Sequence, residues 1–84
     1  MINHWYFERY DLIIDKVDKQ LIFNILNTSF IVEDRWLMSK LDKFASLVSK
    51  GINDELIRPL TNDIKGRLEQ ILKDKDILKE RKIE

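Results

Sequence analysis

The interpretation of residues 4–15, HWYFERYDLIID, decides the fold expected for this chain. At about 100° per residue on a helical wheel, this stretch and the residues after it separate into two sides. The apolar side gathers Tyr6, Tyr10, Ile13, Ile14, Val17 and Leu21. The polar side gathers His4, Glu8, Asp11, Asp15 and Asp18. This separation predicts an amphipathic helix with a wide apolar stripe.

Residues 6–14, YFERYDLII, have an alternative interpretation as a β-strand, because tyrosine, phenylalanine and isoleucine favour strands. A strand needs a partner, and no second segment shows comparable alternation, so the helical interpretation is preferred. The apolar pattern changes phase after Asp18. The pattern leaves open whether the first helix is continuous or broken near residues 17–19.

The rest of the chain contains two further helical patterns. The first runs from about residue 31 to residue 50, where Gly51 suits the left-handed position just past a helix. Asn53 then suits the N-cap of the next segment. Pro59 predicts a short turn at residues 54–58 before a last helix that ends near residue 79. We therefore predict an all-α fold, a small three- or four-helix bundle with short connections.

Composition agrees with one small domain covering residues 1–84, with residues 73–84 frayed. The 84 residues include two glycines, one proline and no cysteine, which favours helices and excludes disulfides and thiolate metal sites. Fifteen basic and fifteen acidic residues give a net charge of zero, which argues against a DNA-coating protein. The longest apolar runs have three residues, far below the roughly 20 that span a membrane. No secretory signal is evident, so we expect a cytoplasmic protein.

The residues that most resemble a metal or acid–base site are His4, Glu8 and Asp11, which would share one face of the first helix. A single helix presents such side chains along a line, whereas a catalytic metal needs ligands that converge on one point. The same face would be solvated, so neither carboxylate would acquire the raised pKa of a general acid. We therefore expect no catalytic, cofactor-binding or metal-binding residues and no enzyme activity. An enzyme or metal protein built on these three residues is the least favoured function.

Both of the first two predicted helices carry apolar residues away from their main stripes. On the second helix, several of these lie beside lysines, as a binding surface would require. A second core face of a helix that is touched on two sides would give the same pattern, so the exposure of Trp36 and Leu47 stays open. The candidate interface residues are Trp5, Leu12, Val32, Trp36, Lys40, Lys43 and Leu47.

This surplus of apolar surface predicts a non-catalytic interaction or regulatory protein, such as an inhibitor or adaptor. It would bind and modulate a larger protein, form a homodimer, or both, because association buries area that so small a chain cannot bury by itself. The alternative is a nucleic-acid-associated regulator that uses lysines of the second and last helices. Acidic residues between those lysines weaken this alternative.

Overall fold

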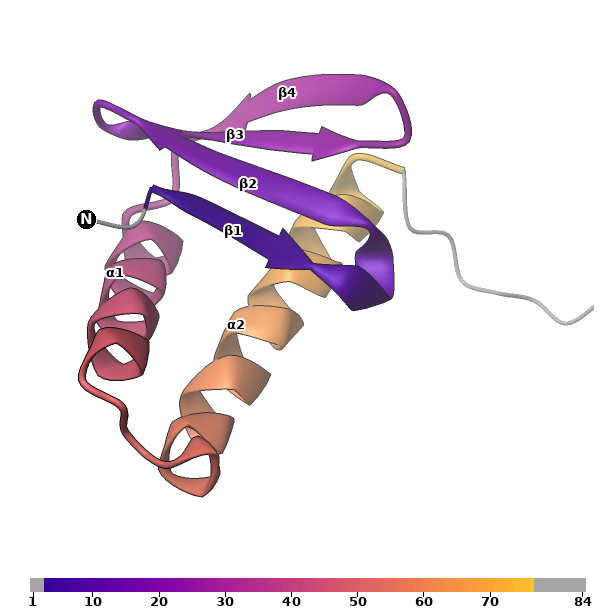
Figure 1. The fold of residues 1–84 in the computed structure, drawn as a ribbon. Coiled ribbons are helices and arrows are strands. Elements are labelled where there is room, and N and C mark those ends of the chain that lie inside the picture. Colours follow the sequence, from indigo (N-terminus) through magenta and orange to yellow (C-terminus); the bar gives the residue numbers. More distant parts are fainter. Residues whose placement is uncertain (1–2, 77–84) are drawn as a thin grey trace, which may run out of the picture. The chain divides into compact units, whose positions relative to one another are not determined.

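The computed structural model describes residues 3–76 and has an α+β fold. Four strands form one antiparallel sheet in the order β1-β2-β3-β4, and they lie side by side in this order in Figure 1. A short 3-10 helix, Glu8–Tyr10, follows the first strand. The strands and helices are β1 His4–Phe7, β2 Leu12–Val17, β3 Gln20–Ile25, β4 Thr28–Val32, α1 Arg35–Ser49 and α2 Asp54–Asp74.

The prediction of an all-α helical bundle is therefore wrong. The residues assigned to the first helix belong to β1, β2 and β3. The first residues of the second predicted helix, 31 and 32, belong to β4. Each strand pairs with the next through a short connection, so every strand obtains its partner locally. Successive side chains of a strand point to opposite faces, and one face of this sheet is buried. This inner face carries Trp5, Leu12, Ile14, Leu21, Phe23 and Ile25.

Two-residue turns without glycine connect the last three strands. Asp18 has a φ of 58° in the turn between β2 and β3. Leu26 and Asn27 both have positive φ, 51° and 62°, in the turn between β3 and β4. Two successive positive φ angles are the mark of a type I′ turn, whose twist matches that of the strands it joins. Asn27 suits this geometry and Leu26 does not, so the sequence lacked the usual signal for a hairpin.

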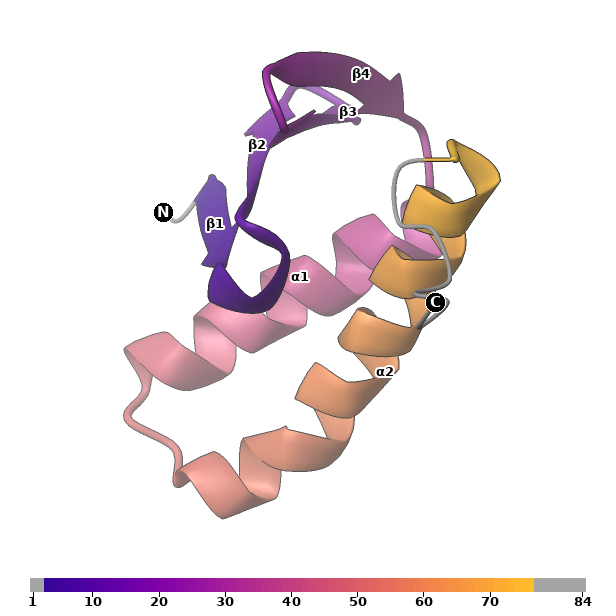
Figure 2. The same cartoon turned by 90° about the vertical axis from the view of Figure 1, so that its right-hand side faces the viewer.

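The chain forms two compact units, residues 1–42 and residues 43–84. The first unit contains the sheet and the beginning of α1; Figure 2 shows the four strands from a second direction. Its buried set is completed by Leu37 and Leu41 of α1, four residues apart and thus on one side of the helix. The Nζ of Lys16 on β2 lies 3.0 Å from Oδ2 of Asp42, which ties the sheet to α1.

The second unit contains the end of α1 and all of α2. Gly51 has a φ of 73°, and the N–H of Ile52 donates to the carbonyl of Leu47 over 3.1 Å, which confirms the predicted helix end. Asn53 caps α2, as predicted, by accepting a 2.7 Å hydrogen bond from the N–H of Glu55. Buried side chains recur every three or four residues along this helix, at Ile57, Leu60, Ile64, Leu68 and Leu72.

Two details of the second unit correct the prediction. Residues 54–58 are helical rather than a turn, and Pro59 lies inside α2. The helix ends at Asp74 rather than near residue 79. Of the region predicted to fray, residues 73–84, the part from residue 77 lies outside the described residues. Within residues 3–76, neither helix has the length and apolar character needed to cross a membrane.

Candidate functional site: the outer face of the sheet

The side of the sheet opposite the buried set is termed the outer face. It follows from strand alternation and from the register, which sets Asn24 opposite Ser29 and Ile22 opposite Ile31. The ten strand residues of the outer face are His4, Tyr6, Ile13, Asp15, Val17, Gln20, Ile22, Asn24, Ser29 and Ile31. None of these ten is a lysine or an arginine.

Half of the outer face is apolar or aromatic. Tyr6 lies opposite Ile13 on β1 and β2, and Ile22 lies opposite Ile31 on β3 and β4, so the two pairs form a diagonal band. Tyr6 is 55% exposed, Ile31 53% and Val17 48%. The solvated face of an antiparallel sheet is usually polar. An exposed apolar band on such a face is typical of a surface that contacts another molecule.

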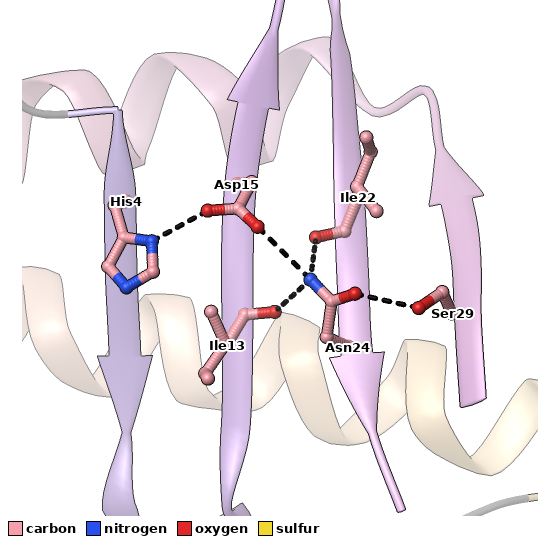
Figure 3. A network of polar contacts seen from close by, with 6 residues as sticks. All are labelled: His4, Ile13, Asp15, Ile22, Asn24 and Ser29. Carbon is pink, nitrogen blue, oxygen red and sulfur yellow. Dashed lines mark hydrogen bonds and ion pairs between the residues drawn. The ribbon is translucent and has the colours of Figure 1, made fainter. Parts of the chain in front are cut away.

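A polar network crosses the same face along the other diagonal (Figure 3). Nδ1 of His4 lies 2.6 Å from Oδ1 of Asp15, and Nδ2 of Asn24 donates to Oδ2 of Asp15 over 3.2 Å. Asn24 also donates to the carbonyls of Ile13 and Ile22, and its Oδ1 accepts a 2.7 Å hydrogen bond from the hydroxyl of Ser29. One side chain from each strand is thus joined in a line across the sheet.

The chemistry available to this network is limited by its geometry. A carboxylate beside Nδ1 of a histidine orients the ring, as in acid–base dyads, but such a dyad needs a nucleophile or substrate at Nε2. Ser29 stands three strands from His4, roughly 14 Å away at the usual strand spacing, and its hydroxyl donates to Asn24. Within residues 3–76, no group of three or more histidine, aspartate or glutamate side chains is arranged to hold a metal ion.

Tyr6 closes one end of the apolar band and is held by an acidic neighbour. Its hydroxyl donates to Oδ1 of Asp11 over 3.2 Å. Partial desolvation raises the pKa of Tyr6, and the charges of Asp11 and Glu8 raise it further. The neutral phenol is therefore the form that this face presents.

The structure does not assemble the constellation of His4, Glu8 and Asp11 that the sequence brought to attention. His4 lies against Asp15 of the neighbouring strand. Glu8 belongs to the 3-10 turn after β1, and Asp11 follows that turn, where it bonds Tyr6. The polar partner of His4 was missed because it is eleven residues away, a separation that only a sheet brings into contact.

The predicted interface residues are distributed over several environments. Trp5 and Leu12 lie on the inner face and are buried, Val32 at the end of β4 and Leu47 of α1 are half-buried, and Lys43 is exposed. Trp36 is 39% exposed, and the Nζ of Lys40 stands over its ring at 5.5 Å from the centroid. Trp36 and Lys40 thus lie together at the surface, and their contact with a partner stays a prediction.

A hollow of about 590 Å³ lies at the beginning of α1. It is lined by Lys19 of the β2–β3 turn and by Glu33, Arg35 and Met38. Within residues 3–76, neither Lys19 nor Arg35 takes part in an ion pair, whereas Glu33 accepts a 3.1 Å hydrogen bond from Gln20. The hollow thus combines two cations, one carboxylate and one half-buried methionine, and Trp36 and Lys40 are not among its lining residues.

Comparison with protein-family models, with curated proteins and with solved structures gave no match for this chain. The outer face is half apolar and carries one carboxylate, Asp15, whereas the hollow at the beginning of α1 carries charges of both signs. Within residues 20–25, QLIFNI, every second residue lies on the outer face, but Ile22 between two buried apolar residues obscured this alternation in the sequence.

Proposed function

We propose that this protein is a non-catalytic interaction protein that binds another protein chain through the outer face of its sheet. The observation that supports this function is the diagonal band of Tyr6, Ile13, Ile22 and Ile31 on a solvated sheet face. Burying the exposed half of one such side chain contributes about 1 kcal/mol, so a partner that covers several of them gains useful affinity.

The construction of the face supports the same proposal. The four strands carry the apolar band on paired backbones, and the network from His4 to Ser29 holds the polar side chains between them. A surface that is already ordered loses little conformational entropy when it binds. Binding would also occupy the partner's own contact surface, and this is how the protein would modulate that partner. The lack of cysteine agrees with action in the cytoplasm.

Nucleic acid is a less well supported partner. Phosphate groups require lysine or arginine side chains, and the ten residues of the outer face include neither. The cations of the first unit lie elsewhere: Lys40 stands over the ring of Trp36, and Lys19 and Arg35 line a hollow that also contains Glu33. A few cations with a carboxylate among them give only a weak contact with a charged backbone.

Site-specific photo-cross-linking in the cells that express the protein tests the proposal. A photoreactive phenylalanine derivative replaces Ile31 on the outer face or Leu56 on α2, which at 72% is more exposed than Ile31. Position 31 should give a discrete cross-linked protein product that position 56 does not give. The Tyr6→Asp change, on the other side of the face, should abolish that product. Equal products from positions 31 and 56, or none from position 31, would contradict the function.

A further inference from the structure

We propose that the open edge of β4 pairs with the β4 edge of a second copy, antiparallel, so that two four-stranded sheets join into one continuous sheet. The pairing uses the main chain of β4 rather than the outer face, and it does not depend on the proposed function. The observation that carries it is the hydrogen-bonding pattern of the sheet, which leaves two residues of β4 with their main-chain groups directed away from β3.

The direction of the main-chain groups follows from one hydrogen bond at the start of the sheet. The N–H of Lys16 donates to the carbonyl of Asn3 over 2.8 Å, so Lys16 of β2 turns its main chain toward β1. In an antiparallel ladder, the N–H and C=O of one residue point to the same side, and those of the next residue point to the opposite side. Asp15 therefore turns toward β3, where its partner is Ile22.

The same alternation determines which groups of β4 are open. Phe23 follows Ile22 and turns its main chain toward β4, where its partner is Phe30. Ser29 and Ile31, on either side of Phe30, therefore direct their N–H and C=O groups to the edge. The sheet ends at β4 (Figure 1), and no other residue that the structure describes hydrogen-bonds the main chain of Ser29 or Ile31.

A second β4 matches this edge along its whole length. The two open residues lie symmetrically about Phe30, the middle residue of the strand. A copy related by a two-fold axis at Phe30 places Ser29 opposite Ile31 of the second copy, and the two residues of such a pair exchange both of their hydrogen bonds. Thr28 then lies opposite Val32 of the second copy, so all five residues of β4 are paired.

The strand β4 also has none of the features that usually protect a sheet edge from other copies. Its sequence, TSFIV, contains no charged residue, no proline and no glycine, and its register with β3 is unbroken by a bulge. Every copy presents the same edge to every other copy, so an unprotected edge favours self-pairing. In the two-fold register Glu33 falls opposite Asn27 of the second copy, so no like charges face each other there.

The burial of β4 agrees with a further strand beside it. The inner-face residues of β3 are buried, whereas Phe30 and Val32 on the inner face of β4 are only half-buried. A paired strand covers one flank of such side chains. At the other edge of the sheet, Trp5 of β1 is buried without an additional strand. Residues opposite each other in a ladder lie on the same face, so the pairing also makes the outer faces of the two copies continuous.

Sedimentation equilibrium of the full chain tests the pairing. Two short strands make an interface below the standard size, so association should be weak, and concentrations from about 5 to about 500 µM cover the expected range. The average mass of the wild-type chain should rise toward twice the monomer mass and no further, because a two-fold contact is closed.

Proline substitutions separate the two edges. Ile31→Pro removes an open N–H without removing a ladder bond to β3, so this variant should stay monomeric across the range. Tyr6 lies opposite Ile13, which turns its main chain toward β3, so Tyr6→Pro removes an open N–H of β1. This matched control should associate as the wild type does. Circular dichroism checks that both variants keep their fold.

Cysteine pairs test the register without blocking the edge. The chain has no cysteine, and Thr28 and Val32 of the second copy would form a non-hydrogen-bonded pair with Cα atoms about 4.5 Å apart, which a disulfide spans. A mixture of Thr28→Cys and Val32→Cys chains should give an oxidised heterodimer, identified by its intact mass. Thr28→Cys alone, or mixed with Leu56→Cys on α2, should not give a covalent dimer.

A wild type that is monomeric throughout, an assembly larger than two copies, or a Thr28→Cys and Val32→Cys mixture without heterodimer would overturn the pairing. If the wild type is monomeric but position 31 cross-links a different protein in cells, the pairing is wrong and the proposed function stands. If the chain dimerises in this register but position 31 cross-links only a second copy, the pairing stands and the proposed function is wrong.

Discussion

The imidazole of His4 and the carboxylate of Asp15 face each other across β1 and β2, with Nδ1 2.6 Å from Oδ1 and their Cα atoms in register. Asp15 is the shared member of the network, since its other oxygen accepts from Asn24. Asp15→Ala should therefore lower the free energy of unfolding by about 1–2 kcal/mol. His4→Ala removes only one exposed pair and should cost less than about 1 kcal/mol. Urea unfolding at pH 7 measures both; equal losses would show that Asn24 does not depend on Asp15.

Trp5 is buried on the inner face, and its Nε1 has no hydrogen-bond partner within residues 3–76. An unsatisfied buried N–H costs about 1–3 kcal/mol, which partly offsets the apolar area that the indole buries. Trp5→Phe removes this N–H together with some volume, so it should change the free energy of unfolding by less than about 1.5 kcal/mol. Trp5→Ala leaves a cavity and should cost about 3–5 kcal/mol. Similar losses for both variants in thermal or urea unfolding would refute this account.

Leu26 is an exposed residue held at a φ of 51° in the turn between β3 and β4. Asparagine tolerates this left-handed geometry better than leucine does. Leu26→Asn should therefore stabilise the fold by about 0.5–1 kcal/mol, since no buried contact is lost. Leu56→Asn, at an exposed helical position with ordinary φ, serves as the control and should not stabilise. A gain at both positions in urea unfolding would assign the effect to surface polarity instead of the turn.

The raised pKa of Tyr6 depends on partial desolvation and on the carboxylate of Asp11. Asp11→Asn keeps a residue type that tolerates the observed φ of 54° and removes the negative charge, so the pKa of Tyr6 should fall. Ultraviolet titration in a Tyr10→Phe background follows Tyr6 alone. Because the pKa is higher in the folded chain than in the unfolded one, its contribution to stability is complete below the unfolded pKa of about 10. That contribution should be lost as the pH rises through the folded pKa, and less of it should exist in Asp11→Asn.

Local features of the second unit were accessible to sequence reasoning. Gly51 ends α1 with a positive φ, and Asn53 caps α2 with its side chain, as the sequence indicated. Both are decided within a few residues, where the side chain bonds or relaxes the adjacent backbone. The position of Pro59 inside α2 was not anticipated.

The sheet and the candidate site were not accessible in the same way. Ile13 and Ile14 share one stripe on a helical wheel, yet in the sheet Ile14 is buried on the inner face and Ile13 lies on the outer one. The apolar residues of the outer face blurred the alternation that marks a half-buried strand. The feature that supports binding therefore also concealed the strands.

By itself the sequence determined where α1 ends and that Asn53 acts as a helix cap, because caps act on their own backbone neighbours. It did not determine that α2 runs from Asp54 through Pro59 without a turn. Only the tertiary structure decided that residues 4–32 form a four-stranded sheet, since a strand is completed by hydrogen bonds to a partner that no single stretch specifies. The same pairing set His4 opposite Asp15 and left the band from Tyr6 to Ile31 facing water.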